Sequence, residues 1–291
     1  MTFLYISSMP PSSPPVVLTI AGFDPASGAG ITADIKTIAA HGCYGVACIT
    51  ALTVQSTAGV KRVEPVPAEL IRATLEELAD DLAISAVHIG MLGGGPAAEA
   101  VAAFLARRGL GNVVLDPIFR SSSGADLVDS SGRKSLVEKL IPLATVLTPN
   151  VDEAAFLTGL PVSNLEQMRT AASKLHSMGA AAVVVTGGHL EHPTDLLSFP
   201  GPREVEQQTF KSGKQRSRST HGTGCAFSTA IACHLALGRS LPEAVLLAKS
   251  YVSAAISHAY PLGRGIGPLH HLYRLHQKRR TVRHVEPETA H

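Results

Sequence analysis

Residues 16–42 read VVLTIAGFDPASGAGITADIKTIAAHG, and this stretch contains each part of a strand–turn–helix unit. Its first six residues are aliphatic or β-branched and form a run of the length expected for one buried strand. After a glycine-rich turn, Ile31, Ile35 and Ile38 recur at helical spacing and make one apolar stripe. Gly42 stands where a glycine that ends a helix belongs. The stretch therefore predicts a strand followed by a helix over 31–41.

Short aliphatic runs and longer segments of helical period go on alternating along the chain. This alternation predicts an α/β fold, in which a mostly parallel central sheet carries helices on both faces. Pro, Gly and polar residues over 195–217 interrupt the pattern and predict a small β-meander. The expected strands are 16–21, 46–51, 86–89, 112–116, 145–147 and 182–185, and the expected helices are 31–41, 67–80, 96–108, 132–141, 152–157, 165–178, 225–237 and 241–258.

The composition is that of a protein with a large aliphatic core, since 45% of the residues are hydrophobic but only 4% are aromatic. The sequence shows neither an internal repeat nor a long linker. We therefore expect one domain over 15–276, a disordered leader over 1–14 and a charged tail over 277–291. The four cysteines form no CxxC pair and are expected to be reduced thiols, which favours a cytoplasmic location.

Charge and hydropathy argue against two classes of partner. The formal net charge is only +2 and no basic stripe is interleaved with aromatic residues, so a nucleic acid is not expected. No stretch approaches the roughly 18 apolar residues of a membrane span.

The nucleotide motif GxxxxGK[ST] is missing, and Gly28–Ala33 matches GxGxxA without directly following its strand. A dinucleotide-binding oxidoreductase is therefore disfavoured.

Polar residues gather after the expected strands, where open α/β sheets bind their ligands. Asp116 ends an otherwise aliphatic strand, and Asn150 and Glu153 follow the next one. An Asn with a Glu three residues later is typical of a capping box at the start of a helix. The same pair at a strand end also suits a hydrated Mg²⁺, which uses few protein carboxylates. Spacing alone leaves both interpretations open.

Four other residues carry weaker signals. Asp34 lies off the apolar stripe of its helix and by that pattern is a solvated acid. Gln55 and Met91 follow strands and form either ordinary loop or pocket wall. His88 lies inside a strand and is expected to be a core histidine rather than a metal ligand.

Near the end of the chain, the turn THGTGC at residues 220–225 delivers a cysteine to the start of a helix. Backbone N–H groups in such a turn point at one spot beside the positive end of the helix dipole, and they form an anion hole. The same field is expected to lower the pKa of Cys225 and favour its thiolate. In the alternative interpretation Cys225 is only a small residue that permits close packing, as Cys233 is expected to be.

An ordered series of stretches covers nearly the whole chain, from about Val16 to His271. The stretches are TIAGFDPASGAGITADIKT, ITALTVQST, IGML, VVLDP, TPNVDEA, GGH, THGTGC and GIGPLHH. In this series the chain resembles the hydroxymethylpyrimidine/phosphomethylpyrimidine kinases of thiamine biosynthesis, within the ribokinase-like superfamily. The resemblance implies a homodimer that uses ATP and Mg²⁺. It also implies phosphorylation of 4-amino-5-hydroxymethyl-2-methylpyrimidine and then of its monophosphate to the diphosphate.

The resemblance further implies roles for individual residues. Cys225 matches the general base of the superfamily, which is usually Asp. The other matching groups are an anion hole of Gly222, Thr223 and Gly224, the substrate-binding residues Gly22, Asp34, Gln55 and Met91, the ATP- and phosphate-binding residues Asp116, Asn150, Glu153, Thr186 and Gly188, and, for Mg²⁺ held through water, Asn150 and Glu153.

Two positions depart from the pattern of that family. Thr186 precedes GGH and Ser122 precedes Ser-Gly, at places where the family usually or often has lysine. Arg120 is a hypothetical replacement for the missing positive charge. A pyridoxal kinase of the same superfamily and a catalytically weak ligand-binding relative are the alternatives. The amide of Gln55 suits an aminopyrimidine edge better than a pyridoxal ring, and Cys in place of Asp disfavours a sugar kinase.

Overall fold

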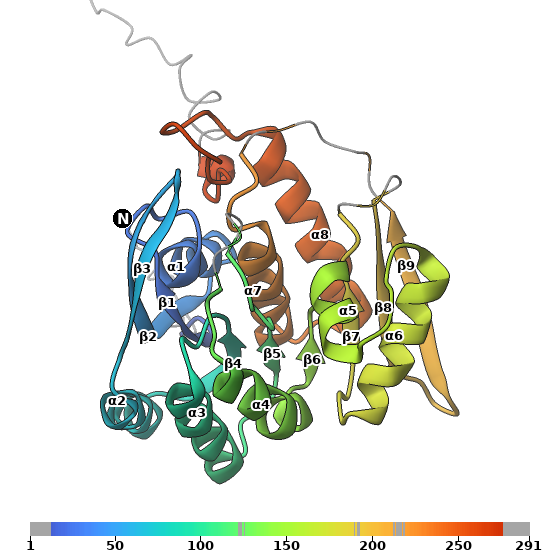
Figure 1. Ribbon diagram of the computed structural model, residues 1–291, viewed down its shortest axis with the longest axis horizontal. Helices are drawn as coiled ribbons and strands as arrows, with labels where there is room; N and C mark the ends of the chain where they lie inside the picture. The colour runs from blue at the N-terminus through green and yellow to red at the C-terminus, as the bar shows by residue number, and fades with distance from the viewer. Residues whose placement is uncertain are drawn as a thin grey trace, which may run out of the picture.

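The computed structural model describes residues 13–121, 124, 126–188, 190, 193–211, 213, 217 and 219–275. Its centre is one nine-stranded sheet with the strand order β3-β2-β1-β4-β5-β6-β7-β8-β9 (Figure 1). The strands are β1 Val16–Phe23, β2 Tyr44–Ser56, β3 Gly59–Pro65, β4 Ile84–Ile89, β5 Val113–Leu115, β6 Val146–Leu147, β7 Val183–Val185, β8 Thr194–Pro200 and β9 Val205–Lys211.

The inner strands are parallel and the edges of the sheet are antiparallel. β1 pairs in parallel with β2 and β4, and parallel pairing continues from β4 to β7. β3 runs antiparallel to β2, as β8 does to β7 and β9 to β8. The short inner strands β5 and β7 consist of Val and Leu residues that are all buried, as expected for parallel strands with helices on both faces. The predicted α/β fold is confirmed.

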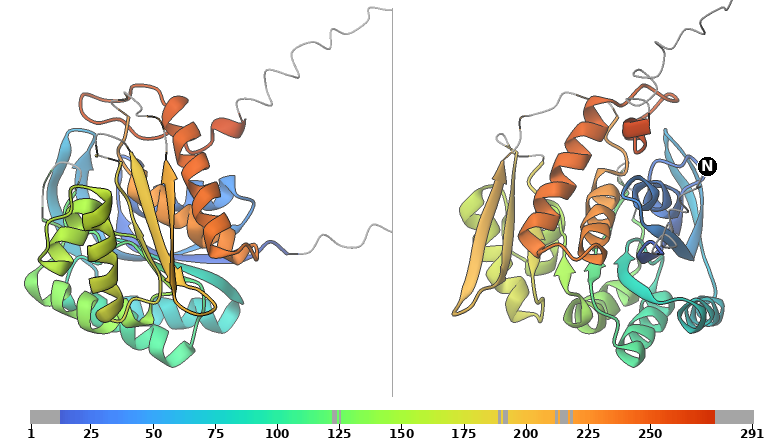
Figure 2. Two further views of the ribbon diagram at one scale, coloured as in Figure 1. Left: turned by 90° about the vertical axis from the view of Figure 1, so that its right-hand side faces the viewer. Right: turned by 180° about the vertical axis from the view of Figure 1, so that it is seen from behind.

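Helices cover both faces of the sheet (Figures 1 and 2). α7 and α8 pack together and α1 contacts α7 on one face, while α2 and α3 pack together on the other. In α7 every residue from Cys225 to Cys233 is buried, because this helix lies between α1, α8 and the sheet. The helices are α1 Gly30–Ala40, α2 Ala68–Asp81, α3 Gly95–Arg108, α4 Ser130–Ser135, α5 Val151–Thr158, α6 Leu165–Ser177, α7 Thr223–Ala236 and α8 Leu241–Ser257.

Two parts of the sheet differ from the sequence prediction. The strand expected over 46–51 is the much longer β2, which turns at Thr57 and returns as β3. Near its tip, the residues of both strands of this hairpin are exposed or half-buried, so they lack the buried aliphatic runs that identify the inner strands. The meander expected over 195–217 is the pair β8 and β9, which extends the central sheet rather than forming a separate unit.

A further difference concerns the helix expected over 132–141. The α-helical part, α4, ends at Ser135, and the chain continues as a π-helical turn over Leu136–Leu140 and a 3₁₀ turn over Ile141–Leu143. Residues 277–291 and most of 1–14 lie outside the described part of the chain, so the predicted leader and tail stay predictions. Within the described residues, no helix has both the length and the apolar run that crossing a bilayer requires.

A buried ion pair joins the last helix to the sheet. Lys249 on α8 donates to Asp195 on β8 at 2.5 Å, and their side chains are only 12% and 8% exposed. The other carboxylate oxygen of Asp195 accepts from the Gly187 N–H at 3.0 Å. The pair therefore holds the segment after β7 as well as α8.

We predict that Lys249→Met strongly destabilises the fold. It leaves the Asp195 carboxylate buried without its cation, a loss that typically costs about 3–5 kcal/mol. The matched control is Lys139→Met, because Lys139 pairs with Glu99 at 2.7 Å on the surface, with side chains 48% and 56% exposed. Urea unfolding monitored by circular dichroism measures both variants. Equal midpoints for the two would contradict the assigned role of the buried pair.

Candidate active site

The carboxyl ends of three adjacent strands bring together residues predicted to bind ATP and phosphate. Asp116 follows β5, Asn150 follows β6 and Thr186 follows β7. Asn150 and Thr186 form a parallel bridge, and the Val151 N–H donates to the Thr186 carbonyl at 3.2 Å. Thr186 is half-buried and Gly188, two residues further on, is exposed. These residues therefore form one edge of the sheet, although they are distant in sequence.

Asn150 and Glu153 form the capping box that their spacing predicts. The Asn150 side-chain oxygen accepts from the Glu153 N–H at 2.9 Å, and the Glu153 carboxylate accepts from the Asn150 N–H at 2.8 Å. The structural interpretation of this pair is thus confirmed. A role in Mg²⁺ binding stays a prediction, which the second carboxylate oxygen of Glu153 leaves room for.

The buried carboxylate of Asp116 and the half-buried one of Glu153 suit a cation at this edge. Burial raises the pKa of Asp116 to about 6, an effect that nearby His88 and a hydrogen bond from Ser228 only partly offset. Burial and then the charge of Asp116 raise the pKa of Glu153 well above its ordinary value. Since a cation stabilises the charged form of such groups, Asp116 and Glu153 fit Mg²⁺. The described residues contain no cluster of three His, Cys, Asp or Glu side chains, so phosphate and water oxygens would complete its coordination.

The turn before α7 lies directly on the loop after β1. Gly222 is the N-cap of α7 with φ of 80°, and a Cβ built on it would lie 1.9 Å from the Gly28 carbonyl oxygen. A Cβ built on Gly224 would lie 3.6 Å from a carboxylate oxygen of Asp116. The Thr223 hydroxyl donates to the Thr220 carbonyl at 2.7 Å within the turn. The predicted anion hole therefore lies beside the strand ends.

The predicted lowering of the Cys225 pKa is wrong. Cys225 is 9% exposed, and burial raises the pKa of its thiol well above the ordinary value. The charges of Asp116, Asp34 and Glu153 raise it further, and a hydrogen bond with the Gly30 backbone only partly opposes them. The positive end of α7 is thus outweighed by desolvation and by carboxylates from other elements. These effects favour the thiol over the thiolate.

Asp34 is not the solvated acid that its helical position suggests. It has no exposed surface, and it accepts from the Thr19 hydroxyl at 2.7 Å and from the Thr229 hydroxyl at 2.9 Å. His88 lies 3.3 Å away and is a core histidine, as predicted. Burial opposes protonation of His88, but the charge of Asp34, its hydrogen bond and the charge of Asp116 together raise the pKa of His88. A contact between Asp34 and a substrate would require one of these partners to be exchanged.

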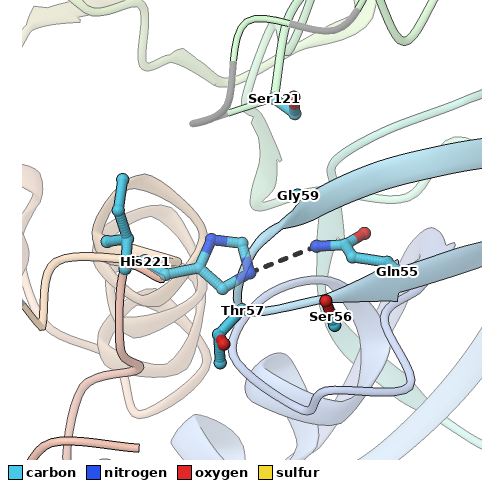
Figure 3. Close-up of a pocket in the computed structure, with 7 residues that line it drawn as sticks. Gln55, Ser56, Thr57, Gly59, Ser121 and His221 are labelled. Atoms are coloured by element: carbon cyan, nitrogen blue, oxygen red, sulfur yellow. Dashed lines mark hydrogen bonds between the residues drawn. The ribbon is translucent and has the colours of Figure 1, made fainter. Parts of the chain in front are cut away.

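Gln55 lines a pocket at the carboxyl end of β2 (Figure 3), whose walls are Gln55, Ser56, Thr57, Gly59, Ser121, His221 and Ile266. Gly22 and Met91 are buried against one another close to this end of the sheet, and a Cβ at Gly22 would lie 2.9 Å from the Met91 sulfur. The residues predicted to bind substrate thus divide into a pocket wall, an apolar contact and the buried Asp34.

The sequence interpretation missed one pair of residues. His221 Nε2 lies 2.9 Å from a carboxylate oxygen of Asp24, and the two side chains are 11% and 4% exposed. Both belong to quoted stretches, Asp24 to GFDPASGAG and His221 to THGTGC, but nothing in the sequence indicates that these stretches meet. The one sequence signal for this pair was that each residue lies beside a glycine-rich turn.

The structure describes the hypothetical replacement Arg120 but not Ser122, one of the two positions that depart from the family pattern. Ser122 lies outside the described residues. Arg120 pairs with Asp126 at 3.0 Å and its side chain is 71% exposed, so its charge is already partnered at the surface. Its role as a substitute for lysine stays a prediction.

Similarity to known proteins identifies the family of this chain. The profile of the phosphomethylpyrimidine kinase family matches residues 24–270. The chain belongs to this family. A hydroxymethylpyrimidine/phosphomethylpyrimidine kinase from Streptomyces coelicolor is 42% identical over 263 residues, which are 90% of this chain and 96% of that protein.

Solved structures of two related kinases have the same fold as this phosphomethylpyrimidine kinase family member. An ADP complex of Bacillus subtilis pyridoxal kinase superposes with a TM-score of 0.81 at 34% identity, covering 90% of this chain and all of that one. The phosphomethylpyrimidine kinase of Clostridium difficile gives a TM-score of 0.74 at 36% identity, covering 83% of this chain and 99% of that one.

We predict that Gly222→Ala destabilises the protein more than Gly238→Ala. Both glycines have a left-handed φ, 80° and 77°, but a Cβ at Gly238 meets nothing within 4 Å. The control therefore carries only the backbone strain of about 1–2 kcal/mol. The clash of Gly222→Ala with the Gly28 carbonyl adds roughly 1–3 kcal/mol. Thermal and urea unfolding compare the variants, and equal losses of stability would show that the contact between the two loops is dispensable.

Proposed function

We propose that this chain is an ATP-dependent kinase that phosphorylates 4-amino-5-hydroxymethyl-2-methylpyrimidine and then its monophosphate, in thiamine biosynthesis. The observation that carries the proposal is the family match over residues 24–270, which includes every candidate site residue except Gly22. The name of the Streptomyces coelicolor relative includes both kinase activities. A further relative, 43% identical over 258 residues, is a thiamine biosynthesis bifunctional protein of Geobacter sulfurreducens. From the resemblance we also propose a cytoplasmic homodimer.

The pyrimidine ring is proposed to lie in the pocket beside Gln55, whose carboxamide offers both a hydrogen-bond donor and an acceptor. Gly22 and Met91 supply apolar surface near it, and the glycine leaves the space that the methionine sulfur needs. Asp34, on α1, holds β1 and α7 together by accepting hydrogen bonds from Thr19 and Thr229. The donor and acceptor of the Gln55 carboxamide match the amino group and ring nitrogen of an aminopyrimidine.

In the first step, the hydroxymethyl oxygen attacks the γ-phosphorus of ATP, the bond from that phosphorus to ADP breaks, and the alcohol proton passes to a base. The N–H groups at the start of α7 would stabilise charge on the phosphoryl oxygens, because they lie beside Asp116 at the strand ends. Mg²⁺, when bound near Asp116 and Glu153, would balance the carboxylate and phosphate charges. Thr186 and Gly188 are proposed to contact the ATP phosphates from the segment after β7.

Cys225 is proposed as the base of the first step only. The second step transfers phosphate to a phosphate oxygen, and no alcohol has to lose a proton. Since burial and the neighbouring carboxylates raise the pKa of the Cys225 thiol, its base form is a minor fraction at neutral pH. The rate of alcohol phosphorylation should therefore depend on how much thiolate the site allows.

The proposal predicts the products of one incubation. The protein with Mg·ATP should convert hydroxymethylpyrimidine to the monophosphate and diphosphate, with ADP released, as chromatography and ³¹P NMR would show. Pyridoxal offered at the same concentration should be turned over more slowly. Binding of the pyrimidine without ADP release would select a catalytically weak relative, and faster turnover of pyridoxal would select a pyridoxal kinase.

We predict that Cys225→Ala lowers alcohol phosphorylation by about 10²–10⁴-fold, the usual contribution of a general base. Phosphorylation of the monophosphate should change far less. In the wild type, the alcohol step should accelerate about tenfold per pH unit between about pH 7 and pH 9, because the raised pKa keeps the thiolate fraction small there.

Cys233→Ala is the matched control, since Cys233 is a fully buried thiol in the same helix that contacts none of the proposed reacting groups. It should leave both steps and the pH profile unchanged. Full activity of Cys225→Ala toward the alcohol in an ADP-release assay would refute the base assignment.

A further inference from the structure

Two side chains that line the pocket and a third that contacts one of them come from separate parts of the chain, and the proposed function uses only one of the three. Asp24 lies in the loop between β1 and α1, Gln55 near the end of β2, and His221 in the turn before α7. His221 Nε2 lies 2.9 Å from Asp24 and 3.3 Å from the Gln55 side-chain nitrogen. Figure 3 shows the imidazole and the carboxamide pointing toward one another across the pocket.

Asp24 determines where the imidazole of His221 carries its hydrogen. One Asp24 oxygen accepts from the Ala26 N–H at 2.8 Å, and the other accepts from Gly28 at 3.1 Å and Ala29 at 3.0 Å. Burial opposes ionisation of Asp24, but the hydrogen bonds from His221 and the backbone outweigh it and its pKa is lowered. An ionised carboxylate can only accept. His221 Nε2 must therefore carry a hydrogen and donate it.

That hydrogen selects one orientation of the Gln55 carboxamide. An N–H of His221 beside the amide nitrogen, as drawn in Figure 3, places two donors face to face. At the other end of the amide, Thr53 Oγ1 lies 3.2 Å from the side-chain oxygen, yet its hydroxyl already donates to the Phe23 carbonyl at 2.9 Å. Exchanging the amide atoms, which have nearly the same shape, removes both conflicts: the oxygen faces His221 and shares the Nε2–H that Asp24 also accepts, and the nitrogen faces Thr53.

We propose that His221, held by Asp24, is a positioning residue that fixes which end of the Gln55 carboxamide faces each side of the pocket, and thereby the direction of the bound pyrimidine ring. This inference rests on the proposed function. Gln55 then offers an acceptor beside α7 and a donor beside Thr53. An aminopyrimidine matches this order only with its amino group on the α7 side.

The direction of the ring bears on the chemistry. The hydroxymethyl carbon is bonded to the ring atom next to the one that carries the amino group. An amino group on the α7 side therefore turns the hydroxymethyl group toward the start of α7, where Cys225 lies four positions after His221. The reversed amide would accept a reversed ring and turn the alcohol away. His221 thus couples recognition of the amino group to placement of the reacting oxygen.

The inference is tested with two ligands of opposite polarity. In the 4-oxo analogue of hydroxymethylpyrimidine, an oxygen replaces the amino group and the neighbouring ring nitrogen carries hydrogen, so its donor and acceptor are exchanged. Dissociation constants from calorimetry, without ATP, give the preference of each variant for the amino over the oxo ligand. His221→Phe should reduce that preference about tenfold or more, because the freed amide can turn to match either ligand.

Two variants serve as controls. Thr220→Val alters the neighbouring exposed residue of the same turn and should keep the wild-type preference. In a Gln55→Glu background, His221→Phe should change the preference by no more than about twofold, because a carboxylate has oxygen at both ends and the coupling is lost. Circular dichroism establishes that each variant is folded.

The outcomes separate this inference from the proposed function. If the wild type binds neither ligand, the proposed function fails and the inference with it. If the wild type prefers the amino ligand and His221→Phe keeps that preference, only the inference is overturned. Should His221→Phe not fold, the tautomer in the wild type decides: long-range ¹H–¹⁵N correlation of histidine rings should show hydrogen on His221 Nε2. A bare Nε2 would overturn the inference.

Discussion

The close contact between Gly222 and the Gly28 carbonyl is the constraint on which the rest of the site depends. Without a side chain at Gly222, the turn before α7 can rest on the loop after β1. The same approach brings His221 to Asp24 and lets Cys225 hydrogen-bond with the Gly30 backbone. Loops that lie almost two hundred positions apart in sequence thus become one wall (Figure 1).

Burial controls the pKa values of the acidic groups near the start of α7. The buried Asp34 and Asp116 and the half-buried Glu153 come from three different parts of the chain, and their charges act on Cys225. A helix end carries only about half a positive charge, which does not compensate for desolvation and three carboxylates. Asp34 has His88 as a partner, whereas burial raises the pKa of Asp116 and, with the charge of Asp116, that of Glu153. The excess of negative charge therefore lies at the phosphate edge, where a cation is needed.

Local patterns in the sequence were sufficient wherever the structure itself is local. The aliphatic runs predicted the inner strands, and Asn150 with Glu153 predicted a capping box that forms as expected. The hairpin of β2 and β3 escaped because an edge strand needs no buried run. The pKa of Cys225 was predicted in the wrong direction because the glycine turn is visible in sequence, whereas burial and the acids from other strands are not. The pair of Asp24 and His221 was missed for the same reason.

Thr186 and Ser122 stand at positions where the family usually or often has lysine. Arg120 is paired with Asp126 at the surface, and Lys249 is committed to Asp195, which in turn holds the Gly187 N–H. Through Asp195, Lys249 therefore shapes the backbone of the segment that follows Thr186. On the proposed function, backbone N–H groups at α7 and Mg²⁺ would then balance the phosphate charge. Two contacts position these backbone groups: Asp195 accepts from the Gly187 N–H, and the turn before α7 rests on the Gly28 carbonyl.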